Sequence, residues 1–240
     1  AELREALRVY TAGLHGDPGP DRIAVTSSGV TALMTAMQLL VDAGDEVVVV
    51  VPVWPNLPAQ PAILGARVTR VPLAPDATGA WRLDLGRLLA AVTPATRVLL
   101  LNAPNNPTGW ALTRAEQQAL LDHCRRTGTW IVADEVYDRV WFGEEQGPQT
   151  PAASAPEGRA PAWDGPARAL AAPSFSDLTT PDDRVVVVHS FSKSFLMTGW
   201  RLGWLLLPRG QLDAVGKLIE FNSSCAPVFV QQGGLQAVAM

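Results

Sequence analysis

The residue best suited to covalent chemistry in this sequence is Lys193. Only two of the 19 Lys and Arg residues are lysines, Lys193 and Lys217, and Lys193 comes shortly after the apolar run 185–188. Arginine stays charged in proteins, whereas a desolvated lysine amine can lose its proton and attack a carbonyl carbon. Taken by itself, the stretch 190–201 fits a nucleophilic lysine and a surface lysine in a strand-to-helix loop equally well.

Other residues that could bind a ligand or take part in a reaction also follow predicted strands. In a parallel α/β sheet, ligands bind beyond the carboxyl ends of the strands, so residues that follow different strands meet at one edge. The residues placed in this way are Ser28, Gly29, Val30, Trp54, Asn106, Asp134, Tyr137, Ser190, Lys193 and Arg201. They combine a helix start that favours phosphate with an aromatic ring, a carboxylate, a phenol, a lysine and an arginine. This set predicts a cofactor site.

Each of these residues also has a purely structural interpretation. Ser28 fits a helix cap, Trp54 fits packing between prolines, and Arg201 fits a surface ion pair. Asp134 fits a helix cap, or the acidic strand end of a nucleotide hydrolase. The hydrolase interpretation fails because the sequence has no GxxxxGK[ST] loop, and a GxGxxG dinucleotide fingerprint is missing too.

Strands and helices alternate along the predicted chain. The predicted strands are residues 23–26, 47–51, 67–71, 97–101, 130–133, 185–188 and 203–207, and the predicted helices are residues 2–14, 32–41, 83–92 and 113–126. The last helix begins with Thr113 and has Glu116 three residues later, which is the spacing of a capping box. Continuous apolar strands are typical of sheets covered on both faces. We therefore expect an α/β fold, with a mainly parallel seven-stranded sheet sandwiched by helices.

The domain organisation is predicted as one large domain over residues 1–240, truncated at both ends. Residues 143–172 are rich in Pro, Ala and Gly and predict a loop insertion within that domain. A further apolar helix starts near residue 230 and stops with the chain, which is typical of a chain cut within a domain.

Composition excludes several functional classes. The sequence is 48% hydrophobic and 18% charged with a net charge of −4, which gives no electrostatic basis for binding nucleic acid. Two distant cysteines and three scattered histidines predict neither a disulfide framework nor a metal site. No apolar run approaches the ~20 residues that span a bilayer, and the N-terminus is unlike a signal peptide. We expect a cytoplasmic protein with no membrane partner.

The strand-end motifs resemble those of a known enzyme family. They are Asn105-Asn106-Pro107-Thr108-Gly109, Asp134-Glu135-Val136-Tyr137, Ser190-Phe191-Ser192-Lys193 and Thr198-Gly199-Trp200-Arg201-Leu202-Gly203. Together they resemble the class I/II aminotransferases of fold type I, which depend on pyridoxal 5'-phosphate (PLP). The resemblance covers the chain from about residue 23 to its end, in the family's order.

The resemblance implies a role for each catalytic residue. Lys193 would form the internal aldimine with PLP and carry the substrate proton. Asp134 would pair with the pyridine nitrogen and keep it protonated. Tyr137 and Asn106 would hydrogen-bond the ring's 3′ oxygen, and Trp54 would stack on the ring.

The resemblance also implies how the phosphate is held and which partners the protein has. The implied phosphate ligands are Ser28, Gly29, Val30, Ser190 and Arg201. The substrates would be an L-amino acid and a 2-oxo acid, the last strand would be antiparallel, and the full-length protein would be a homodimer. The family's small C-terminal domain, which carries the arginine for the substrate α-carboxylate, is missing from this chain.

Three alternatives to a transaminase stay open. A PLP-dependent β-lyase of the same fold uses the same residues. Ser190 and Lys193 also fit the S-x-x-K pattern of penicillin-recognising enzymes, although no K-T-G element occurs. A third alternative is a catalytically incomplete fragment that only binds cofactor or dimerises.

Overall fold

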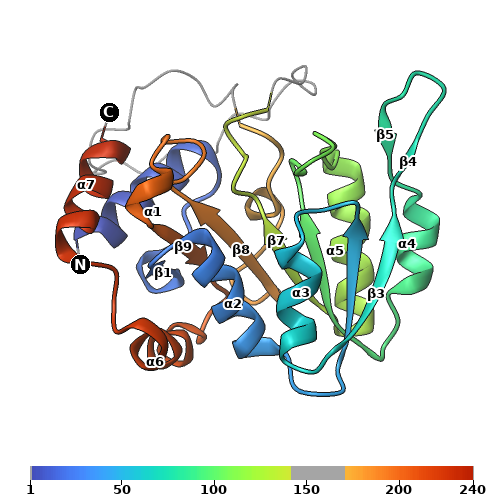
Figure 1. The fold of residues 1–240 in the computed structure, drawn as a ribbon, viewed down its shortest axis with the longest axis horizontal. Coiled ribbons are helices and arrows are strands. Elements are labelled where there is room, and N and C mark those ends of the chain that lie inside the picture. Colours follow the sequence, from blue (N-terminus) through green and yellow to red (C-terminus); the bar gives the residue numbers. More distant parts are fainter. Residues whose placement is uncertain (1, 142–170, 240) are drawn as a thin grey trace.

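A seven-stranded sheet forms the centre of the molecule, in a computed structural model that describes residues 2–141 and 171–239 (Figure 1). Its strand order is β1-β9-β8-β7-β6-β2-β3. The strands are β1 (Ile23–Thr26), β2 (Glu46–Val51), β3 (Arg67–Pro72), β6 (Thr96–Asn102), β7 (Trp130–Asp134), β8 (Val185–Ser190) and β9 (Gly203–Leu206). β9 is antiparallel to both β1 and β8, and all other neighbours are parallel. The predicted α/β fold and the antiparallel last strand are confirmed.

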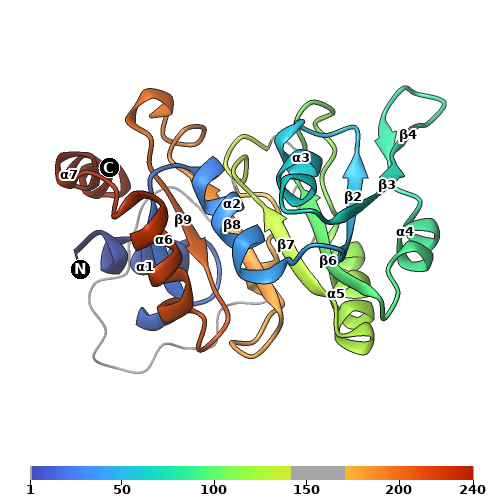
Figure 2. The ribbon, with the colours of Figure 1, turned by 60° about the horizontal axis from the view of Figure 1, so that its bottom comes forward.

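Helices cover both faces of the sheet (Figures 1 and 2). They are α1 (Glu2–Leu14), α2 (Gly29–Leu40), α3 (Asn56–Ile63), α4 (Leu85–Ala91), α5 (Arg114–Thr127), α6 (Leu212–Ser223) and α7 (Val228–Val238). Side chains alternate along β8, so that Val185 and Val187 pack with α1, α5 and α7, while Val186 and Val188 pack with α2 and α6. The sheet therefore separates two hydrophobic cores, which explains why its strands are continuously apolar.

Helix caps explain where α5 and α2 begin. In α5 the predicted capping box is present, because Thr113 N donates to Glu116 Oε2 and Glu116 N donates to Thr113 Oγ1. In α2 the Ser28 side chain accepts a hydrogen bond from Thr31 N at 3.0 Å. This cap starts the helix at Gly29, three residues before the predicted start at residue 32.

Two helices and a small hairpin are absent from the sequence-based prediction. Helix α3 contains Pro61, which normally breaks a helix, but Leu57 and Pro61 are buried against the sheet. Helix α6 buries only Val215 and Ile219, so its apolar stripe is narrow. The hairpin of β4 (Ala74–Pro75) and β5 (Trp81–Arg82) has strands too short to show any periodicity.

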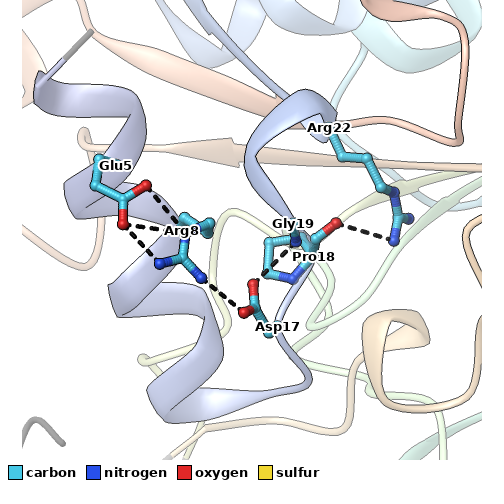
Figure 3. A network of polar contacts seen from close by, with 6 residues as sticks. All are labelled: Glu5, Arg8, Asp17, Pro18, Gly19 and Arg22. Atoms are coloured by element: carbon cyan, nitrogen blue, oxygen red, sulfur yellow. Dashed lines mark hydrogen bonds and ion pairs between the residues drawn. The ribbon is translucent and has the colours of Figure 1, made fainter. Parts of the chain in front are cut away.

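The segment between α1 and β1 is held by charged side chains at the surface. Figure 3 shows Arg8 between Glu5 of the same helix and Asp17 of the following turn, with N–O distances of 2.6 Å to each. Asp17 also accepts a hydrogen bond from Gly19 N, and Pro18 O accepts one from Arg22. Exposed ion pairs stabilise a fold only weakly, so their main effect is to fix the turn that leads into β1.

The predicted insertion 143–172 lies almost wholly outside the described residues. Its last residue, Ala172, is buried and donates a backbone hydrogen bond to Asp138 O. Among the described residues, none of the helices combines the length and the apolar character that crossing a membrane requires.

Candidate active site

A cavity of about 210 Å³ lies at the carboxyl edge of the parallel strands. It is lined by Gly29, Val30, Leu33, Trp54, Asn102, Asn106, Asp134, Val136, Tyr137, Ser190, Ser192, Lys193, Thr198 and Arg201. Every residue that the strand-end argument selected is in this lining except Ser28. Residues from five different strand ends are thus brought together, as a parallel sheet requires.

A chain of amide hydrogen bonds positions the ends of β6 and β7. Asn102, the last residue of β6, donates from Nδ2 to the backbone oxygen of Asp134 at 3.0 Å and accepts from the backbone nitrogen of Asn106 at 2.8 Å. Asn106 in turn donates from Nδ2 to Tyr137 Oη at 3.2 Å. The carboxamide of Asn102 therefore fixes the loops that carry the carboxylate and the phenol relative to each other.

Asp134 is a buried carboxylate whose neighbours offer it few hydrogen bonds to replace those with water. In the described part of the chain its side chain accepts one hydrogen bond, a long one of 3.4 Å from Val136 N. Burial raises the pKa of Asp134 to about 7, although that hydrogen bond and the charge of Lys193 both act to lower it. Burial of an incompletely paired carboxylate is costly, so this position favours a cationic partner inside the cavity.

The Lys193 side chain faces the ring of Tyr137, with Nζ 5.5 Å from the ring centroid. The loop that carries it leaves β8 at Ser190, whose Oγ accepts a hydrogen bond from Ser192 N at 3.1 Å. Backbone bonds from Leu196 N to Lys193 O and from Met197 N to Phe191 O close this loop. The lysine is thus presented from a short, internally bonded turn rather than from a helix surface.

The start of α2 also lines the cavity. The first N–H groups of a helix have no partner within the helix, and the helix dipole favours an anion there. Gly29 and Val30 place these groups at the cavity. Ser28 does not line the cavity; it lies behind it, with its hydroxyl engaged by Thr31 N.

Arg201 adds a positive charge to the lining of the cavity. It has a left-handed backbone conformation with φ of 57°, which is uncommon outside glycine. Its Nη1 donates to Thr198 O at 2.9 Å, and its side chain remains exposed to solvent. The guanidinium group is therefore held by a backbone carbonyl of its own loop and is still exposed to solvent.

Five lining residues were not selected from the sequence as candidate site residues: Leu33, Asn102, Val136, Ser192 and Thr198. Asn102 and Val136 each sit beside a selected strand-end motif, so the same strand-end argument could have included them. Leu33 lies one turn into α2, and only the packing of that helix against the sheet brings it to the cavity. Glu135, by contrast, points away, and its Oε1 accepts a hydrogen bond from Phe175 N at 3.0 Å.

Comparison with known proteins identifies the class. Residues 1–239 match the family described as aminotransferase class I and II, and the chain belongs to that family. It is 33% identical over 218 residues to an aspartate aminotransferase of Musicola paradisiaca, covering 90% of this chain and 47% of the relative. It is 32% identical over 219 residues to an arginine–pyruvate transaminase of Pseudomonas aeruginosa, covering 91% of this chain and 48% of the relative.

Solved structures agree with this assignment. The aspartate aminotransferase of Thermotoga maritima superposes with a TM-score of 0.81 at 28% identity, covering 100% of this chain and 56% of that chain. The aromatic aminotransferase of Pyrococcus horikoshii also superposes with a TM-score of 0.81, at 26% identity. The chain thus spans about half the length of the relatives that it matches, and it has the sheet and helices of fold type I aminotransferases.

Proposed function

We propose that the full-length protein is a PLP-dependent aminotransferase that moves the amino group of an L-amino acid to a 2-oxo acid. The observation that carries this proposal is the pairing of two groups in one cavity, the buried carboxylate of Asp134 and the amine of Lys193. Family membership and the transaminase names of the relatives support it.

The residues of the cavity fit this cofactor. A protonated pyridine nitrogen is the kind of cation that the poorly paired Asp134 carboxylate favours. The helix start at Gly29 and the guanidinium group of Arg201, which line the same cavity, suit a phosphate. Crowding around the glycine supports the same interpretation, because a Cβ atom on Gly29 would lie 2.8 Å from Ser190 Cβ. Only glycine therefore lets the start of α2 pack this closely on the end of β8, where both segments line the cavity.

We assign the cofactor contacts as follows, as part of the proposal. Gly29, Val30, Ser190 and Arg201 bind the phosphate, Asp134 the ring nitrogen, Asn106 and Tyr137 the ring oxygen, Trp54 the ring face, and Lys193 the carbonyl carbon. Ser28 acts indirectly, because its cap fixes the N–H groups of the first turn of α2. PLP, when bound, supplies an electron-accepting ring that stabilises negative charge at the substrate α-carbon.

The chain's own groups would then handle the proton. Lys193 Nζ would accept the proton from the substrate α-carbon, since it is the basic side chain that faces Tyr137 within the cavity. The charge of Asp134 would lower the energy of a positive ring nitrogen. The Asn106–Tyr137 hydrogen bond would keep the phenol oriented while this happens.

The proposal also includes the setting of the full-length protein, a cytoplasmic homodimer. Both cysteines are unpaired, Cys124 in the core and Cys225 at the surface, which suits a reducing compartment. Large apolar side chains are exposed on the last two helices, including Phe221 and Phe229. Such residues suit a face that is covered in the whole protein.

The decisive experiment loads the full-length protein with PLP, reduces it with borohydride and maps the attached pyridoxyl group by peptide mass spectrometry. We expect the label on Lys193 and no label there in Lys193→Ala. A wild-type protein that takes up no label at Lys193 would refute the proposal. Product analysis then separates transamination, which yields a new amino acid, from β-elimination, which yields ammonia and pyruvate.

A further inference from the structure

The carboxylate of Asp138 lies close to the cofactor cavity but does not line it. Asp138 follows Tyr137 in the turn after β7, is 5% exposed and has its backbone nitrogen bonded to Glu135 O at 3.0 Å. Its side-chain Oδ1 accepts two hydrogen bonds, from Arg139 N at 2.8 Å and from Ser194 Oγ at 2.9 Å. The second bond crosses from the β7 turn to the residue immediately after Lys193.

The surroundings of Asp138 make this bond important for the carboxylate. His189 Nδ1 lies 3.9 Å from Asp138 Oδ2, too far for a hydrogen bond. Burial lowers the pKa of His189 to about 4 in spite of the opposing charge of Asp138, so the imidazole is neutral at pH 7 and does not balance the carboxylate. Ser194 is therefore the side chain that hydrogen-bonds Asp138 among the described residues.

The bond joins the two segments that carry the reactive groups. One segment runs from Asp134 to Asp138 and includes the phenol of Tyr137. The other contains Lys193 next to Ser194. Within the described residues, the 2.9 Å bond is the side-chain hydrogen bond that links these two segments directly, whereas the lysine and the phenol meet only through a 5.5 Å ring contact.

We propose that Asp138 is a positioning residue whose hydrogen bond to Ser194 holds Lys193 against Tyr137 and Asp134. The inference rests on the proposed function, because the position of the lysine relative to the carboxylate and the phenol matters for activity only when PLP occupies the cavity. The position of the lysine can be measured without cofactor. A hydrogen bond to a charged, buried acceptor is among the stronger ones in proteins, so its loss should move the loop.

The test compares five single variants and one double variant of the full-length protein with the wild type. Ser194→Ala and Asp138→Ala remove the bond. Ser194→Thr keeps a hydroxyl donor and Asp138→Asn keeps an oxygen acceptor, so both should rescue it. Ser176→Ala is the matched serine control, because Ser176 lies in the short helical turn Phe175–Asp177 and its side chain makes no hydrogen bond to the lysine loop within the described residues.

The first readout is the rate at which trinitrobenzenesulfonate labels Lys193 in cofactor-free protein, divided by the rate at Lys217. Lys217 lies on α6 and is exposed, so it serves as an internal reference in the same sample. We expect the ratio to rise at least threefold in Ser194→Ala and in Asp138→Ala. The double variant should show no further rise, because two substitutions that remove the same hydrogen bond do not have additive effects. The two conservative variants and Ser176→Ala should keep the wild-type ratio.

The second readout is the dissociation constant for PLP, followed by its visible absorbance. We expect about a tenfold increase in the two alanine variants and little change in the conservative ones. Circular dichroism at the assay temperature confirms that each variant is folded. Wild-type ratios and affinities in both alanine variants would overturn the proposal. A wild type that does not bind PLP would instead refute the proposed function, while the labelling ratio would still report on the loop.

Discussion

Gly203 packs so closely on the backbone of Gly29 that position 203 has no room for a side chain. A Cβ atom on Gly203 would lie 2.6 Å from the backbone nitrogen of Gly29 and 2.9 Å from His189 O. Gly203 is the first residue of β9 and pairs with both Thr26 of β1 and Ser190 of β8. The antiparallel strand thus packs directly against the start of α2, which lines the cavity and is proposed to bind the phosphate.

Gly203→Ala should therefore destabilise the fold and weaken cofactor binding together. The atoms that a methyl group would meet belong to the backbone, which cannot rotate away, and forced overpacking costs about 1–3 kcal/mol. Gly216→Ala is the matched control, because a Cβ atom there meets nothing within 4 Å and alanine stabilises a helix by about 0.5–1 kcal/mol relative to glycine. Urea unfolding and PLP titration of both variants check this, and a Gly203→Ala protein as stable as Gly216→Ala would contradict it.

Asp134→Asn should stabilise the cofactor-free protein at alkaline pH. Because burial raises the pKa of Asp134 from 3.8 to about 7, the folded protein holds a proton between these values that the unfolded chain has lost. Wild-type stability therefore falls as pH rises from about 4 to about 7, and stays low above that. The buried Glu135, whose pKa burial raises to about 7, is present in both proteins and cancels in the comparison.

The measurement for Asp134→Asn is urea unfolding of both cofactor-free proteins at pH 5 and pH 8. The advantage of the variant should be larger at pH 8 than at pH 5 by at most about 3 kcal/mol, because only about two pH units separate pH 5 from the folded pKa and each unit contributes 1.36 kcal/mol. The variant should also bind PLP more weakly, because its amide is neutral. An advantage that is equal at the two pH values would show that Asp134 is already ionised at pH 5.

Strand ends were the part of the candidate active site that could be predicted from the sequence. Asp134, Tyr137 and Lys193 each follow an apolar run, and topology alone then brings them to one edge. Ser28 shows the limit of that argument, because a helix start needs a cap as well as a ligand site, and here the hydroxyl serves the cap. Sequence position cannot decide between these two uses.

The contacts that cross between loops could not be predicted in this way. Asn102 matters because its carboxamide reaches the backbone of a neighbouring strand, and Gly203 matters because another backbone lies where its Cβ would be. Helix α3 was missed because Pro61 contradicts a helix locally, while burial of Leu57 outweighs that cost. Each case depends on a tertiary neighbour that lies far away along the chain.

Tyr137→Phe tests the hydrogen-bonded side of the cavity. Removing the phenol oxygen leaves Asn106 Nδ2 without its acceptor at 3.2 Å, and a hydrogen bond of this kind contributes about 0.5–1.5 kcal/mol. We expect the dissociation constant for PLP to rise about tenfold. Tyr10→Phe is the matched control, since the sequence has only these two tyrosines and Tyr10 does not line the cavity. Equal affinities in the two variants would place Tyr137 outside the binding machinery.

His15→Gln should cost more stability at acid than at alkaline pH. His15 follows α1, is buried and has Nδ1 3.0 Å from Asp177 Oδ1, while Arg114 contacts the other oxygen of Asp177 at 2.8 Å. Burial alone would lower the pKa of His15, but the hydrogen bond and charge of Asp177, with the charges of Glu135 and Asp138, raise it above 6.5. A raised histidine pKa stabilises the fold fully below the unfolded value and ceases to do so as pH rises through the folded value.

The experiment for His15 is urea unfolding of the wild type and His15→Gln at pH 6 and pH 9. At pH 6 the variant should lose about 1.5–3 kcal/mol, the usual contribution of a hydrogen bond to a charged group, and at pH 9 it should lose less. Asp177→Asn should also reduce the difference in unfolding free energy between pH 6 and pH 9, because it removes the charge that raises the pKa of His15. An equal loss of unfolding free energy in His15→Gln at both pH values would contradict this. It would show that His15 is neutral in the folded protein at pH 6 and that its contact with Asp177 is a hydrogen bond without an ion pair.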